Sequence, residues 1–111
     1  MASKFVLKKS LDGQFRFVLK AGNGETILTS ELYKAKPSAL SGIESVKKNA
    51  AIDERYEKKV DKAGHPRFNL KAGNHEIIGS SESYNSEAAR DNGIASVKAN
   101  AAMAVLDDET A

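Results

Sequence analysis

A stretch near the N-terminus occurs a second time in the same chain, and this duplication determines how the fold is built. Residues 16–23 read Arg-Phe-Val-Leu-Lys-Ala-Gly-Asn, and residues 67–74 read Arg-Phe-Asn-Leu-Lys-Ala-Gly-Asn. Farther on, Gly-Ile-Glu-Ser-Val-Lys-Lys-Asn-Ala-Ala at 42–51 is matched by Gly-Ile-Ala-Ser-Val-Lys-Ala-Asn-Ala-Ala at 93–102. A constant shift of 51 positions superposes the copies without a gap. The chain therefore consists of repeat one, residues 1–55, and repeat two, residues 56–111.

The composition is that of an ordinary globular protein. Its 111 residues are the size of one domain, and 41% are hydrophobic and 29% charged. The absence of cysteine excludes disulfides, thiolate metal sites and thiol nucleophiles. No apolar signal segment or membrane-length stretch is present, so we expect a cytoplasmic protein without membrane contact. A formal net charge of +2 is too small to indicate nucleic acid or a membrane surface as the partner.

Each repeat begins with the pattern of a three-stranded meander. Alternating apolar residues and β-branched side chains predict the strands, and the Asp12-Gly13 and Asn23-Gly24 pairs predict hairpin turns. Pro66 suits the start of a strand, where its missing N–H is tolerated. The predicted strands are residues 5–9, 15–20 and 25–29 in repeat one and residues 55–60, 67–71 and 76–80 in repeat two.

A helix is predicted after the third strand of each repeat, because apolar residues recur at spacings of three and four. Pro37 fits only near the helix start. Glycine inside a helix costs about 1 kcal/mol relative to alanine, and Gly42 and Gly93 interrupt the apolar stripes. We therefore predict a broken helix at residues 35–41 and 43–50 and its equivalent at 86–102. The apolar run at 104–106 is expected to form a closing strand.

We expect the two copies to form a single domain, residues 1–111. A unit of about fifty residues buries little surface alone. Two copies related by an approximate twofold axis would share strand edges and a core, as the subunits of a homodimer do. No spacer rich in glycine, proline or serine separates Ala51 from Tyr56. The expected state is a monomer that acts as an internal pseudo-dimer.

The repeated motifs resemble the YegP-like family of small bacterial proteins of unknown function, in its tandem-repeat form. The resemblance rests on Lys-Ala-Gly-Asn-Gly-Glu at 20–25, Ser-Glu-Leu-Tyr at 30–33, Gly-Ile-Glu-Ser-Val-Lys-Lys-Asn-Ala at 42–50, and their second copies. It implies an α+β fold of two β-β-β-α-β repeats with pseudo-twofold symmetry that share one antiparallel sheet, with helices on one face. It also implies exchanged C-terminal strands: residues 55–60 end one unit and begin the next, and residues 104–108 are the final exchanged strand. The family brings no established activity, cofactor or catalytic residue.

Few residues are candidates for catalysis or metal binding. The glycines of residues 21–24 lead into a strand rather than a helix N-terminus, so a hairpin turn explains them better than a phosphate loop. His65 and His75 lie near turns, lack histidine counterparts in repeat one and have too few companions for a metal site. No nucleophile motif surrounds any serine. We predict no catalytic residue, no metal, no cofactor and no enzymatic activity.

The repeated Ser-Glu-x-Tyr pattern provides the first candidate interaction positions, where strand becomes helix. They are Glu31, Tyr33, Glu82 and Tyr84. In the structural interpretation, serine or glutamate caps the helix and the tyrosine ring packs with a wet hydroxyl. In the functional interpretation, the two copies form symmetric pockets that bind a small polar ligand.

The second set of candidates is basic and lies opposite the phenylalanines on the predicted strands. It consists of Arg16, Lys20, Arg67 and Lys71. Together with Lys47 and Lys98 these side chains would form a basic surface for phosphate or single-stranded nucleic acid. No aromatic side chains are interleaved on that face, as a stacking platform requires, and Glu25 and Glu76 are close in sequence as ion-pair partners. We therefore do not expect nucleic acid as a partner.

Two hypotheses for function remain. The leading one is a non-enzymatic structural or protein-interaction module that contacts a partner protein through sheet edges and the groove at the pseudo-twofold axis. The alternative is a binding protein for a small anionic or nucleotide-like ligand, which would use the repeated Arg, Lys, Glu and Tyr positions. A cleft lined by both Tyr33 and Tyr84 would favour ligand binding, and a convex surface would favour the interaction module.

Overall fold

The predicted strands and hairpins form one sheet. The computed structural model describes residues 3–110. Gly13 and Gly24 have φ values of +84° and +86°, which glycine adopts without steric cost and which close the two hairpins of repeat one. The strands are β1 (Lys4–Lys9), β2 (Phe15–Lys20), β3 (Thr26–Thr29), β4 (Tyr56–Val60), β5 (Pro66–Lys71), β6 (Ile77–Ser80) and β7 (Val105–Asp108).

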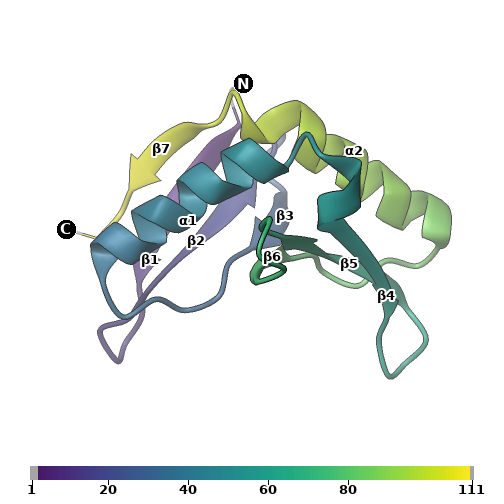
Figure 1. Cartoon of the computed structure of the whole chain (residues 1–111), viewed down its shortest axis with the longest axis horizontal. Helices are drawn as coiled ribbons and strands as arrows, with labels where there is room; N and C mark the ends of the chain where they lie inside the picture. The colour runs from purple at the N-terminus through teal and green to yellow at the C-terminus, as the bar shows by residue number, and fades with distance from the viewer. Residues whose placement is uncertain (1–2, 111) are drawn as a thin grey trace.

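Two continuous helices cover one face of the sheet, α1 (Lys36–Asn49) and α2 (Glu87–Ala101) (Figure 1). Pro37 lies in the first turn of α1, as predicted. The predicted break is wrong, because α1 runs through Gly42 and α2 runs through Gly93. Both glycines are buried against tyrosine rings, so their small size serves tertiary packing and does not end the helix. Of the helices that the structure describes, none has the length and apolar character needed to cross a bilayer.

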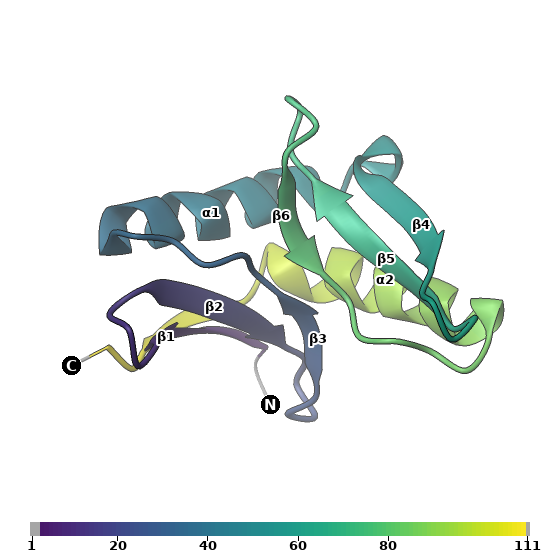
Figure 2. The same cartoon turned by 90° about the horizontal axis from the view of Figure 1, so that it is seen from below.

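The sheet has seven strands in the order β4-β5-β6-β3-β2-β1-β7. Two three-stranded meanders meet where β3 lies beside β6 (Figure 2). All neighbouring strands are antiparallel except β1 and β7, which are parallel. The α+β fold of two repeats in one mostly antiparallel sheet is therefore confirmed.

Strand β7 is the exchanged strand. It follows α2 of repeat two but pairs with β1 of repeat one, where Phe5 lies opposite Leu106. The strand that follows α1 is β4, reached through a short 3-10 turn at Asp53–Arg55, and it pairs with β5 of repeat two. An ion pair of 3.3 Å between Lys4 and Asp107 also joins β1 to β7.

The core is one cluster to which both repeats contribute. Its fully buried side chains include Phe5, Phe17 and Leu19 from repeat one and Phe68 and Leu70 from repeat two. Each helix crosses the boundary between the repeats: α1 contacts β2, β5 and β6, and α2 contacts β5 and β3. Neither repeat therefore has a complete core of its own.

The boundary between the repeats lies at the pairing of β3 with β6. Thr29 lies opposite Ser80, and these residues occupy the same position in the two repeats, so the pseudo-twofold axis passes between them. Leu28 and Gly79 are also repeat equivalents. A Cβ atom on Gly79 would lie 2.6 Å from Cγ of Leu28. The space near the axis therefore holds the Leu28 side chain, and the equivalent position in repeat two, Gly79, has no side chain.

Gly79→Ala tests this size match. The added methyl group overpacks the junction, and we expect the free energy of unfolding to fall by about 1–3 kcal/mol. Leu28→Ala alone leaves a cavity and costs about 2–5 kcal/mol. The Leu28→Ala/Gly79→Ala double variant should be more stable than the two single losses predict, as urea titrations of all four proteins would measure. Strictly additive losses would contradict direct contact between the two positions.

We propose that the two repeats form one folding unit. A fragment of residues 1–55 lacks β5, β6 and β7, so α1 loses part of its packing surface and β1 loses its outer neighbour. We expect this fragment to be largely unfolded as a monomer, by circular dichroism and sedimentation, under conditions in which the full chain unfolds cooperatively. A monomeric fragment with a cooperative melting transition would contradict the proposal.

Candidate functional site

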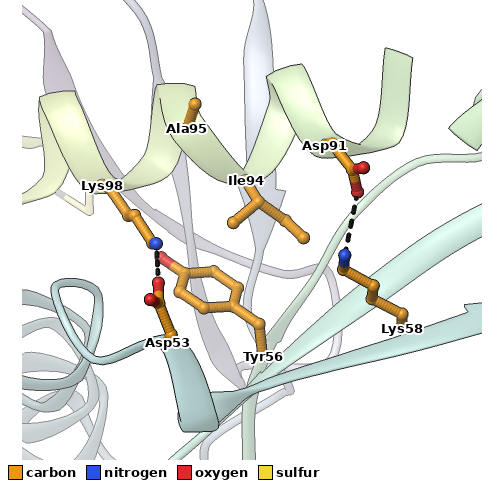
Figure 3. Close-up of a pocket in the computed structure, with 7 residues that line it drawn as sticks. All are labelled: Asp53, Tyr56, Lys58, Asp91, Ile94, Ala95 and Lys98. Atoms are coloured by element: carbon orange, nitrogen blue, oxygen red, sulfur yellow. Dashed lines mark ion pairs between the residues drawn. The ribbon is translucent and has the colours of Figure 1, made fainter. Parts of the chain in front are cut away.

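A groove of about 430 Å³ lies between the edge strand β4 and helix α2 (Figure 3). Tyr56 and Ile94 form its apolar floor. An ion pair between Lys98 and Asp53 closes one end, and a 3.2 Å ion pair between Lys58 and Asp91 closes the other. The groove therefore presents an apolar floor between two pairs of opposite charges and has no strong net charge.

The groups in this groove are not poised for proton transfer. The Tyr56 hydroxyl donates a hydrogen bond of 2.6 Å to the Ala50 carbonyl oxygen, and burial raises its pKa far above the ordinary value. A hydrogen bond from Lys58 lowers the pKa of Asp91. A neutral phenol and an ion-paired carboxylate are groups suited to contact, not to general acid–base catalysis near neutral pH.

In repeat one, β7 lies against the outer edge of β1, the edge equivalent to the one that borders the groove in repeat two. The groove residues Tyr56, Lys58, Asp91 and Ile94 correspond to Phe5, Leu7, Leu40 and Ile43. In repeat one, Leu106 of β7 pairs with Phe5, and Lys36 of α1 forms an ion pair of 2.5 Å with Asp108 of β7. The groove of repeat two therefore lies at the place that the exchanged strand fills in repeat one.

The tyrosines of the Ser-Glu-x-Tyr pattern are packed against the core. The Tyr33 ring stacks on Phe17 with centroids 6.2 Å apart, and the Tyr84 ring stacks on Phe68 at 6.3 Å. Tyr33 also exchanges two backbone hydrogen bonds of 2.7 Å with Phe15. Each tyrosine ring is therefore fixed by stacking on a phenylalanine of the sheet.

The repeated serines extend the sheet and do not cap the helices. The Ser30 hydroxyl accepts a hydrogen bond of 2.9 Å from the Phe17 N–H and donates one of 2.8 Å to the Glu31 carbonyl oxygen. Ser81 makes the equivalent bonds in repeat two. The cap of α2 is Ser86, which accepts a hydrogen bond from the Ala89 N–H at 3.1 Å, and α1 has no side-chain cap. The predicted capping role is therefore wrong.

Glycine in each helix makes room for the tyrosine of the same repeat. A Cβ atom on Gly42 would lie 2.5 Å from the Tyr33 hydroxyl oxygen, and one on Gly93 would clash with Tyr84 in the same way. The two motifs, Ser-Glu-x-Tyr and Gly-Ile-x-Ser-Val-Lys, are therefore halves of one packing contact. Their recurrence at a fixed spacing has a structural cause.

Glutamates surround both tyrosines. Burial and the neighbouring charges of Glu31 and Glu76 raise the pKa of Tyr33, and burial with Glu82 and Glu25 does the same for Tyr84. A hollow of about 280 Å³ is lined by Tyr84, Glu82 and Glu25, among others, but not by Tyr33. The structure thus does not bring the two tyrosine sets into one cleft. The paired carboxylates also make this hollow unfavourable for an anion.

The basic candidates occupy the helix-free face of the sheet. Arg16 and Lys20 alternate with Phe17 and Leu19 along β2, and Arg67 and Lys71 occupy the equivalent positions on β5. Arg67 donates a hydrogen bond of 3.2 Å to the Ser81 carbonyl oxygen, but none of the four basic residues lines the hollow at Tyr84. Lys47 and Lys98 lie on the helices and cover the rings of Phe5 and Tyr56 at 5.8 Å, so they do not join the basic face.

The histidines make no metal site within residues 3–110. His65 lies 3.8 Å from Asp61, which binds the turn backbone, and His75 occupies a turn position with a φ of +71°. In the described part of the chain, no three His, Cys, Asp or Glu side chains converge as metal ligands.

Comparison with known protein families identifies the family of this chain and matches both repeats. The model for a domain of unknown function, DUF1508, matches the chain twice, at residues 10–57 and 61–108. The chain belongs to the DUF1508 family. It is 60% identical to the UPF0339 protein YegP of Escherichia coli K12, with 99% of this chain and 100% of that protein aligned, and 57% identical to a UPF0339 protein of Acinetobacter baylyi, with 99% of each aligned.

Two solution NMR structures of family members have the same fold. The UPF0339 protein of Shewanella oneidensis matches with a TM-score of 0.93 and 56% identity, covering 99% of this chain and 93% of that one. The Escherichia coli yegP protein, described as a protein of unknown function, matches with a TM-score of 0.93 and 60% identity over 99% and 95% of the two chains. These family names specify no enzymatic activity.

Except for Lys98, the residues that line the groove were not among the sequence-predicted candidates, although the sequence contains a signal for them. Agreement between the repeats directs attention to shared positions, whereas the groove occurs where the repeats differ. Lys58 replaces Leu7, and Asp91 replaces Leu40, so two apolar positions of repeat one become an ion pair in repeat two. A change from apolar to charged residues at equivalent positions indicates that the surface covered in one repeat is open in the other.

Gly42→Ala tests the contact between helix and tyrosine. Alanine favours the helix by about 1 kcal/mol, but a Cβ atom would displace the Tyr33 ring, and overpacking costs about 1–3 kcal/mol. We expect a net loss in the free energy of unfolding, measured in urea. When Tyr33→Ala removes the ring, adding Gly42→Ala should instead increase stability by about 1 kcal/mol. Stabilisation by Gly42→Ala alone would contradict the contact.

Proposed function

We propose that the protein is a non-enzymatic interaction module that binds an extended segment of a partner protein at the outer edge of β4. The observation that carries the proposal is the difference between the two repeats: β7 lies on the edge of β1, whereas the equivalent edge of β4 borders an unfilled groove. Addition of a strand to an open sheet edge is a common mode of peptide recognition, with affinity from backbone hydrogen bonds and specificity from side-chain pockets.

The backbone of β4 supports this mode. In β1, the Leu7 carbonyl oxygen accepts a hydrogen bond of 2.8 Å from the Glu109 N–H. Lys58 is the repeat equivalent of Leu7 and lies opposite Phe68, whose N–H is directed to Ser81 on the far side of β5. The Lys58 backbone groups therefore point away from β5, toward the free edge.

The side chains of the groove define what the partner segment carries. In repeat one, Leu106 lies beside Phe5 on the adjacent strand, and Asp108 is the next residue on the same side of β7. By equivalence, a bound segment would place one bulky apolar side chain over Tyr56 and Ile94, between the two ion pairs. The next side chain on that side would meet Lys58 and Asp91, a pair that favours an uncharged polar residue.

The charges of this edge oppose the pairing of two copies of the chain at β4. Charged side chains on an edge strand discourage indiscriminate strand pairing, and Lys58 and Lys59 lie next to each other on β4. The apolar floor between the two ion pairs leaves one position at which an apolar side chain of the partner segment can be buried. The edge is consequently suited to a selected segment and not to general aggregation.

A synthetic peptide of residues 103–110, which contains β7, is the direct probe. Titrated into the ¹⁵N-labelled full-length protein, it should shift the amide signals of Tyr56–Val60 and of the α2 turns that carry Asp91 and Ile94. Replacing its leucine with aspartate should abolish these shifts, because the groove floor is apolar. No shift in β4 at millimolar peptide would contradict strand addition at this edge.

Lys58→Pro and Lys58→Ala form a matched pair of variants. Proline removes an N–H that points to the free edge, whereas alanine removes the side chain and keeps that N–H. We expect Lys58→Pro to weaken peptide binding about five- to tenfold, the value of roughly one hydrogen bond, and Lys58→Ala to bind much more tightly than Lys58→Pro. Equal affinities of the two variants would show that β4 contributes no backbone pairing.

A further inference from the structure

The helix-free face of repeat one has an unusual arrangement of charge. Lys8 lies directly opposite Arg16, and Lys4 lies directly opposite Lys20, with Val6 opposite Val18 between them. Like charges in directly opposed positions of an antiparallel pair destabilise the sheet. Two such pairs flank Val6 and Val18 on this face, so a negative charge between the pairs would stabilise the sheet.

Repeat two supplies that charge from within the chain. Its cations Lys59, Arg67 and Lys71 correspond to Lys8, Arg16 and Lys20, but the central valine pair is replaced by Glu57 opposite Asn69. The Glu57 carboxylate accepts hydrogen bonds of 2.9 Å from Lys71 and 3.1 Å from Asn69, and it lies 4.0 Å from Lys59. The bond from Lys71, followed by that from Asn69, lowers the pKa of Glu57, so it remains an anion at neutral pH.

Repeat one has no carboxylate in the equivalent place. Lys4 forms an ion pair with Asp107 of the exchanged strand at 3.3 Å. Within residues 3–110, Lys8, Arg16 and Lys20 have no ion-pair partner in the structure. These three side chains line a hollow of about 180 Å³ whose floor is formed by Val6 and Val18.

We propose that this hollow is a binding site for an oxyanion of the phosphate class, carried by a small molecule. The bound group would lie over Val6 and Val18, where Glu57 places its carboxylate in repeat two. Glu57 thus marks the position of a ligand that repeat one takes from solution. The site is distinct from the β4 groove and does not depend on strand addition.

The composition of the hollow favours a phosphate group over a single carboxylate. In repeat two, one carboxylate is shared by two lysines and an amide, whereas repeat one offers three cations and no amide. A guanidinium binds phosphate oxygens through two parallel hydrogen bonds, and lysines add point charges around them. Phe15, Phe17 and Leu19 point to the opposite face of β2, so this face lacks the stacked aromatic side chains that bind single-stranded nucleic acid.

The test is a titration of the ¹⁵N-labelled protein with inorganic phosphate and, separately, with glycerol 3-phosphate. Sodium chloride keeps the ionic strength constant, and acetate is the carboxylate comparison. We expect saturable shifts of the amide signals of Lys8, Arg16, Lys20 and Thr26, and weaker effects from acetate. Tighter binding of the monoester than of phosphate would identify a phosphorylated molecule, and equal binding would identify free phosphate as the ligand. Shifts that spread over all surface lysines, or that acetate reproduces equally, would overturn the proposal.

Matched variants exchange the central cross-strand pair of the helix-free face, Val6–Val18 in repeat one and Glu57–Asn69 in repeat two. Val6→Glu/Val18→Asn rebuilds the internal anion of repeat two in repeat one and should lower phosphate affinity at least tenfold. Glu57→Val removes that anion and should create a second set of saturable shifts at Lys59, Arg67 and Lys71. Arg16→Gln, which leaves the valines in place, should weaken the first site while the peptide still binds at β4. Unchanged phosphate binding in Val6→Glu/Val18→Asn would overturn the proposal. If that variant does not fold, Glu57→Val decides alone, and the absence of new shifts at Lys59, Arg67 and Lys71 would overturn the proposal.

Discussion

The architecture depends on one contact at the pseudo-twofold axis, where Leu28 fills the space left by Gly79. In a true homodimer, residues at the axis face their own copies, so both must have the same size. Here the pairing of Thr29 with Ser80 sets the axis, and the neighbouring repeat positions differ by a whole side chain. The surface of repeat one at the axis therefore fits that of repeat two, but neither surface would fit a second copy of itself. The close approach of the two repeats lets each helix contact strands of both.

Joining two such repeats in one chain makes their outer edges different. The strand after α2 returns to β1, whereas the strand after α1 must continue as β4. One edge is consequently covered by β7, and the equivalent edge of β4 is open. The repeats also differ on the helix-free face, where Val6 and Glu57 occupy equivalent positions. Glu57 neutralises the neighbouring lysines, whereas Val6 leaves the equivalent cations without a carboxylate. Both proposed sites arise at positions where the two copies of one repeat differ.

The sequence allowed much of this fold to be predicted, because strand alternation and turn glycines are local signals. The meanders follow from these local signals and the shared core from the duplication, whereas the exchanged strand is what the resemblance to the YegP-like family implies. Gly42 was misinterpreted as a helix break because its role is set by Tyr33, a contact that helix propensity does not contain. The structural interpretation of the Ser-Glu-x-Tyr pattern, with serine or glutamate as the helix cap, fails in the same way, because Ser30 bonds to the backbone of a neighbouring strand. Lys58 and Glu57 were missed because their meaning depends on which edge and which face the finished sheet leaves uncovered.

The pairing of β7 with β1 has a mechanical consequence. The strands are parallel, and the hydrogen bonds from Val105 to Ser3 and from Glu109 to Leu7 mark the two ends of the pair. A force applied before β1 and after β7 acts at opposite ends of this pair, so it slides the strands past each other and loads all of their hydrogen bonds together. The same force on a hairpin would open its bonds one at a time. The parallel pairing of the exchanged strand is therefore a geometry in which tension along the chain loads the pair in shear.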